Sequence, residues 1–176
     1  MKTLPPFVFF ILRFTAIYTS LSAVYYKYLK QFEAKNLQLD PISNYVAKIT
    51  QKSLQLFDLK VSLLKSNLEP AVLVFINPDK AIVKIIEGCN SISIIILFAS
   101  FIFAFYSGLF RTFLFILLGS LSIFTLNILR IDLFILGLHH YPQHKDFLHD
   151  ILFPLSIYGY VLLLWLIWIF KLNKKP

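Results

Sequence analysis

Four long apolar segments constrain the fold of this 176-residue chain more than any other feature. They cover residues 7–26, 90–106, 112–138 and 151–170, and each is continuous rather than alternating. Runs of about 20 apolar residues are typical of helices that cross a bilayer, where backbone polar groups must be satisfied within the helix. With 58% hydrophobic residues and a mean hydropathy of +0.73, the composition excludes an ordinary soluble domain. The sequence therefore predicts an all-α integral membrane protein with about four transmembrane helices.

The first apolar segment has two interpretations. A basic start followed by an apolar stretch is also the composition of a cleavable signal peptide. However, the segment is long for the apolar part of a signal peptide, it contains Arg13, and no small-x-small cleavage site follows it. We therefore expect a retained N-terminal transmembrane helix within residues 1–26. The order of the later segments is the same under either interpretation.

The region over residues 27–88 is polar and contains nine lysines and six acidic residues. Apolar residues at near-helical spacing predict an amphipathic helix, lying on the membrane or packed on the domain: Ile42, Tyr45, Val46, Ile49, Leu54 and Phe57. Two β-branched runs then flank Asn77-Pro78-Asp79-Lys80, which predicts a β-hairpin with its turn at the proline. We expect a small α+β extracytoplasmic insertion between helices 1 and 2. A three-helix transmembrane core with a basic tail then occupies residues 89–176.

Positive charges near the ends of the apolar segments predict the orientation. With four spans, one side of the membrane carries Lys2, Arg111, Lys171, Lys174 and Lys175. Cytoplasmic segments are enriched in Lys and Arg, so we expect this side, with both termini, to be cytoplasmic. The insertion and the loop over residues 139–150 would then face the outer side of the cytoplasmic (inner) membrane. The net charge of +8 is spread over the polar region and the helix ends, so we expect no binding of nucleic acid.

This orientation places three chemically distinctive residues near the same membrane face. Cys89 begins the second segment beside Asn90 and Ser91, whose side chains suit a helix cap, and His149 begins the fourth segment. Arg130 lies about eight residues before the outer end of the third, or roughly 12 Å at 1.5 Å per residue. Arg111 follows a full membrane crossing and would be about 30 Å away. We therefore interpret Arg111 as a topology charge rather than a site residue.

An arginine inside a membrane span is expected to have a function, because an unpaired guanidinium in lipid costs several kcal/mol. The alternative for Arg130 is a structural salt bridge, for instance with Asp132, although residues two apart on a helix do not face each other. Asn127, three residues earlier, shares the face of Arg130 and is a candidate to orient it. We expect Arg130 to be a site residue.

Cys89 is the only cysteine, so the chain has no internal disulfide, and this thiol is either a packing residue or a nucleophile. A helix start and a nearby arginine both favour the reactive thiolate. Glu87 opposes the thiolate if it lies close and ionised, and we interpret it as a substrate-binding or hydrogen-bonding residue.

Histidine is the usual proton shuttle near neutral pH, and His149 is the nearest of four histidines to the membrane, with Asp146 and Asp150 as possible orienting groups. The other three are expected to be solvated loop residues: His139, His140 and His144. Their spacing matches no recognised zinc pattern. We therefore expect neither a metal nor another cofactor.

Three motifs occur in order along the chain. Glu87-x-Cys89-Asn90-Ser91 begins one apolar segment, Asn127-x-x-Arg130 lies late in the next, and His149 opens the one after that. These motifs, over residues 71–170, resemble the exosortase and archaeosortase family, most closely the short exosortases of the F-type subgroup. The common Cys-Ser-Gly of that family stands here as Cys89-Asn90-Ser91.

The resemblance implies a membrane-embedded cysteine transpeptidase or protease in which Cys89, Arg130 and His149 are catalytic. Glu87 and Asn127 would support them. The implied substrates are surface proteins with a short C-terminal motif, a transmembrane helix and a basic tail, held in membrane lipid. One alternative is a non-enzymatic membrane assembly subunit in which the cysteine and the arginine are structural. A lipid-directed acyltransferase that uses the same thiol is another.

Overall fold

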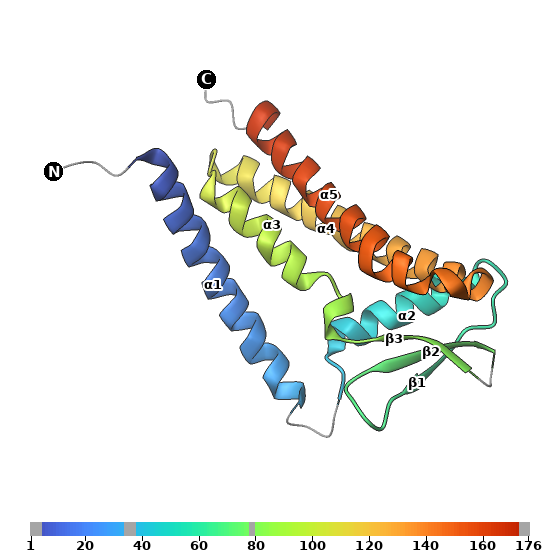
Figure 1. Cartoon of the computed structure of the whole chain (residues 1–176). Coiled ribbons are helices and arrows are strands. Elements are labelled where there is room, and N and C mark those ends of the chain that lie inside the picture. Colours follow the sequence, from blue (N-terminus) through green and yellow to red (C-terminus); the bar gives the residue numbers. More distant parts are fainter. Residues whose placement is uncertain (1–4, 34–37, 78–79, 173–176) are drawn as a thin grey trace.

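The computed structural model describes residues 5–33, 38–77 and 80–172 of the chain. Five α-helices account for most of it: α1 (Pro6–Glu33), α2 (Pro41–Gln55), α3 (Ile92–Ala104), α4 (Leu109–His140) and α5 (Phe153–Ile167). Figure 1 shows α1, α3, α4 and α5 as an elongated bundle with α2 and a small β-sheet beside one end. The start of α1 and the end of α5 both lie at the end away from the sheet.

Three helical segments in the described residues are long and apolar enough to cross a membrane: Pro6–Phe32, Leu109–His140 and Phe147–Phe170. We expected about four full spans, and the described residues contain three helical segments of sufficient length. The second predicted span, 90–106, contains only the 13-residue α3, which is about 20 Å long and shorter than the ~30 Å hydrocarbon core. The chain is nonetheless a mainly helical, multi-pass membrane protein.

The helix bundle has its own apolar core. Its buried residues come from α3, α4 and the C-terminal helical segment, and they include Phe98, Ile102, Ile123, Ile157, Val161 and Trp168. Gly119 on α4 lies against the ring of Phe98, where a Cβ atom would overlap that ring. Small residues at such contacts let membrane helices approach closely, so Gly119 sets the spacing between α3 and α4.

Helix α1 packs mainly on α3, through aromatic contacts such as Phe10 with Phe101, whose ring centroids lie 5.6 Å apart. Most other α1 side chains are exposed, as expected for a helix that faces lipid. Helix α1 continues to Glu33, seven residues beyond the predicted end of the span at residue 26.

The β-sheet has three antiparallel strands in the order β1-β2-β3: β1 (Ser62–Lys65), β2 (Val72–Asn77) and β3 (Lys80–Ile85). The predicted hairpin corresponds to β2 and β3, and its turn residues Pro78 and Asp79 lie outside the described residues. Strand β1 was not predicted, because Ser-Leu-Leu-Lys lacks the β-branched residues that mark strands. Pairing with β2 decides its conformation.

The predicted amphipathic helix exists as α2, but its buried face differs from the predicted one. Asp40 caps the helix, since its Oδ1 accepts 3.0 Å hydrogen bonds from the backbone amides of Ile42 and Ser43. Val46 and Leu54 are fully buried as predicted. Tyr45 is 59% exposed, and Phe57 is 64% exposed and lies beyond the end of α2, so neither packs on the insertion. Ser43, Ala47 and Thr50 complete the buried face in their place, because small residues allow α2 to approach its neighbours.

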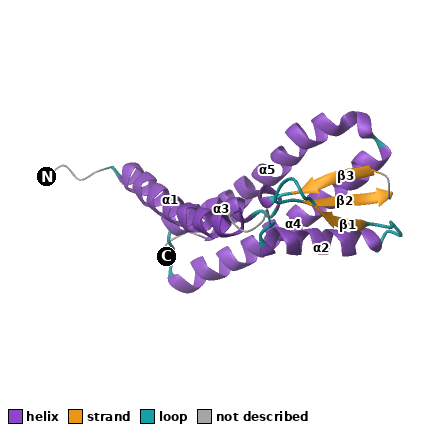
Figure 2. Cartoon of the chain, turned by 90° about the horizontal axis from the view of Figure 1, so that it is seen from below, coloured by secondary structure: helices purple, strands orange, loops and turns teal. Residues whose placement is uncertain are grey.

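Helix α2 and the sheet form a second apolar core against the later turns of α4. Ile128, Ile131 and Ile135 of α4 pack there with Val46, Leu54, Val74 and Ile85. Figure 2 shows β1 on the side of the sheet toward α2 and β3 on the side toward α5. Helix α4 therefore packs against two parts of the molecule. Its first half contacts the bundle, and its second half contacts the insertion. This arrangement brings the end of β3 against the middle of α4.

Candidate active site

The chain between β3 and α3 makes a tight, well-anchored turn that carries Cys89. A 3-10 turn, Glu87–Cys89, follows the strand, and the Cys89 amide donates a 2.9 Å hydrogen bond to the carbonyl of Ile86. Ser91 then adopts φ = +61°, a left-handed conformation that costs a non-glycine residue roughly 1 kcal/mol or more. This turn reverses the chain and sends it into α3 at Ile92.

Asn90 is the anchor of this turn and is 1% exposed. Its Nδ2 donates hydrogen bonds of 2.8 Å to the Tyr25 hydroxyl of α1 and 2.9 Å to the Ser43 hydroxyl of α2. Its Oδ1 accepts a 3.0 Å bond from the Ile92 amide and so caps α3, as predicted. The predicted cap by Ser91 is wrong, because its hydroxyl donates to the Asn90 carbonyl, at 2.6 Å. Asn90 is thus hydrogen-bonded to α1, α2 and α3.

Asn127 fixes the turn from the other side. It is 1% exposed, and its Nδ2 donates a 2.7 Å hydrogen bond to the backbone carbonyl of Cys89. Because the turn packs directly on α4, this amide bonds the cysteine backbone; that Asn127 also orients Arg130 stays a prediction. Helix α4 holds Cys89 through this amide.

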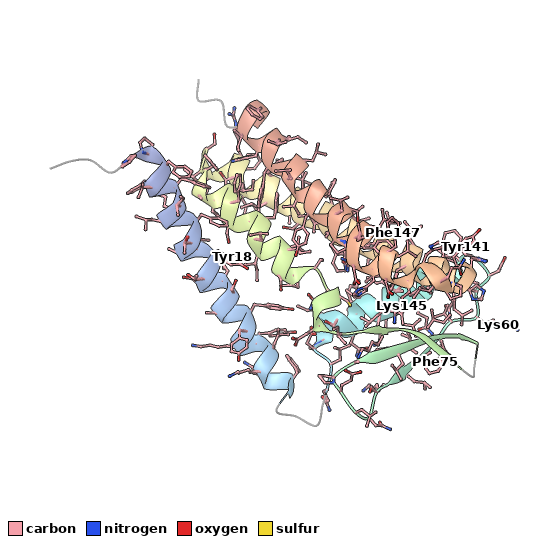
Figure 3. The ribbon with its side chains drawn as sticks, in the orientation of Figure 1. Tyr18, Lys60, Phe75, Tyr141, Lys145 and Phe147 are labelled. Atoms are coloured by element: carbon pink, nitrogen blue, oxygen red, sulfur yellow. The ribbon has the colours of Figure 1, made fainter. Side chains whose placement is uncertain are left out.

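Cys89, Arg130 and His149 line one cavity of about 310 Å³. Cys89 comes from the turn after β3, Arg130 from α4, and His149 from the helical turn before α5. The remaining wall is mostly apolar and includes Ile131, Phe134 and Phe153. Figure 3 shows the neighbourhood of this region: Lys145 and Phe147, in the segment that leads into α5, lie above the sheet that carries Phe75. The structure thus brings together three residues separated by up to 60 positions in the sequence.

Arg130 is half-buried in this wall, close enough to interact electrostatically with Cys89 and with Tyr158 of α5. Among the described residues, its guanidinium has no hydrogen bond or salt bridge. Asp132 does not pair with it, because Asp132 accepts a 2.6 Å hydrogen bond from the Ser53 hydroxyl of α2. The charge of Arg130 is therefore available to a ligand in the cavity.

His149 lies in a π-helical turn, Phe147–Leu152, immediately before α5. Pro154 at the start of α5 cannot donate the usual amide to the carbonyl four residues earlier, which favours a widened turn here. His149 Nδ1 is 2.7 Å from Oδ1 of Asp150, and its ring packs 5.6 Å from that of Phe134. When Nδ1–H donates to this carboxylate, Nε2 is the nitrogen left to exchange a proton.

Residues 8–170 of the chain match the family described as transmembrane exosortase. The chain belongs to the transmembrane exosortase family. No curated protein and no solved structure matches it. Membership indicates, in general, a membrane cysteine transpeptidase that acts on proteins with C-terminal sorting signals. The predicted exosortase resemblance is confirmed, and the F-type subgroup stays a prediction.

Glu87 was expected to support the site, and this role stays a prediction: it lies between Ile86 and Gly88, which both line the cavity of this exosortase. It is half-buried in the turn but does not line the cavity, and it interacts electrostatically with Tyr25 of α1. Arg111 is exposed at the start of α4, 19 residues and about 28 Å before Arg130. Its predicted exclusion from the site agrees with this separation.

The other histidines of the exosortase lie toward the end of α4 and beyond it. His139 and His140 have ring centroids 5.0 Å apart at the last turn. No group of potential metal ligands occurs among the residues that the structure describes. The absence of a metal from the reaction stays a prediction.

The sequence did not predict that Asn90 anchors the turn or that Phe134 packs on His149. The position of Asn90 next to the single cysteine was visible in the sequence, but its partners lie 65 and 47 residues away. Phe134 is one of 19 phenylalanines, and nothing in the sequence distinguishes it from the others. Both contacts depend on the packing of α4 against the insertion.

Proposed function

We propose that this exosortase cleaves C-terminal sorting signals of surface-targeted proteins through a thioester on Cys89. The observation that carries the proposal is the shared cavity of Cys89, Arg130 and His149. A thiol, a proton-transfer group and a fixed positive charge are the three components that cysteine acyl transfer needs.

The first half-reaction forms one bond and breaks another. The Cys89 sulfur attacks the carbonyl carbon of the scissile peptide bond, and His149 takes the thiol proton. The carbon–nitrogen bond then breaks, and His149 returns that proton to the leaving amine, which departs with the membrane anchor. In the second half-reaction an acceptor amine or water attacks the thioester, and its proton returns to the Cys89 sulfur.

Arg130 has an electrostatic role in this scheme. During each attack, negative charge develops on the carbonyl oxygen, and a guanidinium in a partly apolar cavity stabilises this charge more strongly than one in water. Its lack of a protein partner among the described residues supports this role, since no carboxylate there competes with the substrate.

The proposed setting is the outer face of the cytoplasmic membrane, with both termini cytoplasmic. The basic residues near the span ends support this orientation. The position of the sheet at the end of the bundle opposite the start of α1 and the end of α5 is consistent with it. A non-enzymatic assembly subunit is not favoured, because the family consists of transpeptidases in general.

The experiment follows membrane-tailed surface proteins in cells that lack the chain and are supplied with variants. We expect unprocessed proteins to accumulate with Cys89→Ala and with Arg130→Ala. Arg111→Ala is the matched control, because it removes the same side chain from the same helix about 28 Å away. Normal processing by Cys89→Ala, at equal protein levels, contradicts the proposal.

A further inference from the structure

The outer edge of β3 is an unpaired strand edge beside Cys89. The strand order β1-β2-β3 places β3 at the margin of the sheet, and nothing in the described part of the chain pairs with its outer side. An edge strand presents alternate N–H and C=O groups that are ready to pair with another extended chain. Strand β3 ends at Ile85, four residues before the cysteine.

Two adjoining cavities follow this edge. Residues 81–84 line a cavity of about 510 Å³, and residues 83–86 line the cavity that contains Cys89. Beyond the register shift at Ile82, successive side chains of β3 point to opposite faces, so the space lined by Val83, Lys84 and Ile85 follows the backbone edge rather than one face. The two cavities share four residues and therefore form one groove: Val83, Lys84, Phe134 and His149.

We propose that the substrate segment binds as an extended strand along the outer edge of β3, which delivers its scissile carbonyl to Cys89. This inference rests on the proposed function and names the binding mode of the same site. Backbone hydrogen bonds to β3 supply affinity that does not depend on the substrate sequence, as in other cases of strand addition. The six residues of β3 span roughly 20 Å, enough to pair with a segment of about six residues.

The opposite wall of the groove indicates which side chains the segment carries. Phe134 and Leu138 of α4 form an apolar surface, and Lys145 stands near its far end. Because alternate side chains of a strand share one face, we expect apolar residues at every second position of the bound segment. Arg130 lies at the Cys89 end, where the reacting carbonyl would sit.

The test uses the purified full-length chain in detergent and tetrapeptide vinyl sulfones that carry an equimolar residue mixture at each position. The measured quantity is the rate at which Cys89 is alkylated. One backbone amide of the probe at a time is N-methylated, which removes its hydrogen and adds bulk. We expect about tenfold slower labelling when the methylated amide faces β3 and little change when it faces away. The sensitivity should therefore alternate along the peptide.

Iodoacetamide separates failure of the binding mode from failure of the proposed function. If iodoacetamide labels Cys89 and every methylated probe reacts as fast as the parent peptide, strand addition is overturned while the nucleophile stands. If no electrophile labels Cys89, the proposed function itself fails. Hydrogen exchange gives a second readout: labelling with the parent probe should protect amides in β3 but not those in β1, and unchanged exchange in β3 also overturns the inference.

Discussion

The side-chain amide of Asn127 donates a 2.7 Å hydrogen bond to the backbone carbonyl of Cys89. A buried contact between a helix and the turn that carries the thiol fixes where the sulfur lies along α4. Arg130 is three residues further along the same helix and shares its face, so one rigid element sets the position of both groups. The geometry of the site is thus coupled to the packing of the insertion on α4.

Replacement of Asn127 should impair processing without removing any reacting atom. We expect Asn127→Ala to lower stability by about 1–3 kcal/mol, because the Cys89 carbonyl loses its buried donor. Alkylation of Cys89 by iodoacetamide and processing of membrane-tailed proteins measure the effect on the site. Thr125→Ala is the control, since this exposed hydroxyl bonds only within α4. Equal stability and processing in Asn127→Ala and Thr125→Ala would show that the contact is dispensable.

Asp150 should affect the rate of processing modestly. Asp150→Asn replaces the carboxylate that holds His149 Nδ1, but both side chains are 67% exposed and solvent weakens the pair. We expect a two- to fivefold slower rate, corresponding to at most about 1 kcal/mol. Asp146→Asn serves as the control because the carboxylate that contacts His149 Nδ1 is that of Asp150, not that of Asp146. A loss of a thousandfold in Asp150→Asn alone would contradict the weak coupling argued from exposure.

The protein should be more stable with glycine at position 91 than with alanine. Both Ser91→Gly and Ser91→Ala remove the hydroxyl, but only glycine adopts φ = +61° without a steric penalty. We expect the glycine variant to have a free energy of unfolding about 1 kcal/mol higher than the alanine variant. Reversible unfolding in detergent measures the difference. Alanine at least as stable as glycine would rule out the left-handed conformation at this position.

Gly119 should not tolerate a larger residue. In Gly119→Ala the new Cβ would overlap the ring of Phe98, and overpacking of this kind typically costs 1–3 kcal/mol. Gly159→Ala is the matched control, because a Cβ there meets no atom within 4 Å. The double variant Gly119→Ala with Phe98→Leu should recover part of the lost stability. Equal melting temperatures for the two single alanine variants would contradict the close contact of α3 and α4.

The membrane helices show which parts of the fold can be predicted from periodicity and composition. Three of the long apolar runs form helices that are long and apolar enough to cross a membrane, because length and hydropathy are local properties of the sequence. The second run forms only a 13-residue helix, because Ser91 is left-handed and α3 ends at Ala104, so a fourth full span stays a prediction. The burial of Ser43, Ala47 and Thr50 on α2 could not be predicted, because the neighbours of that helix, the sheet and α4, were unknown.

The sequence by itself determined that this chain is an apolar, multi-pass membrane protein with a polar insertion that ends at its single cysteine. It also singled out Cys89, Arg130 and His149, because a thiol, an arginine inside a span and a histidine at a span start are each chemically distinctive. Only the tertiary structure decided that they share a cavity, that Asn127 bonds the Cys89 carbonyl, and that Asn90 anchors the turn to α1 and α2. The physical reason is that hydropathy is encoded residue by residue, whereas the packing of β3, α4 and α5 depends on contacts between residues far apart in the chain.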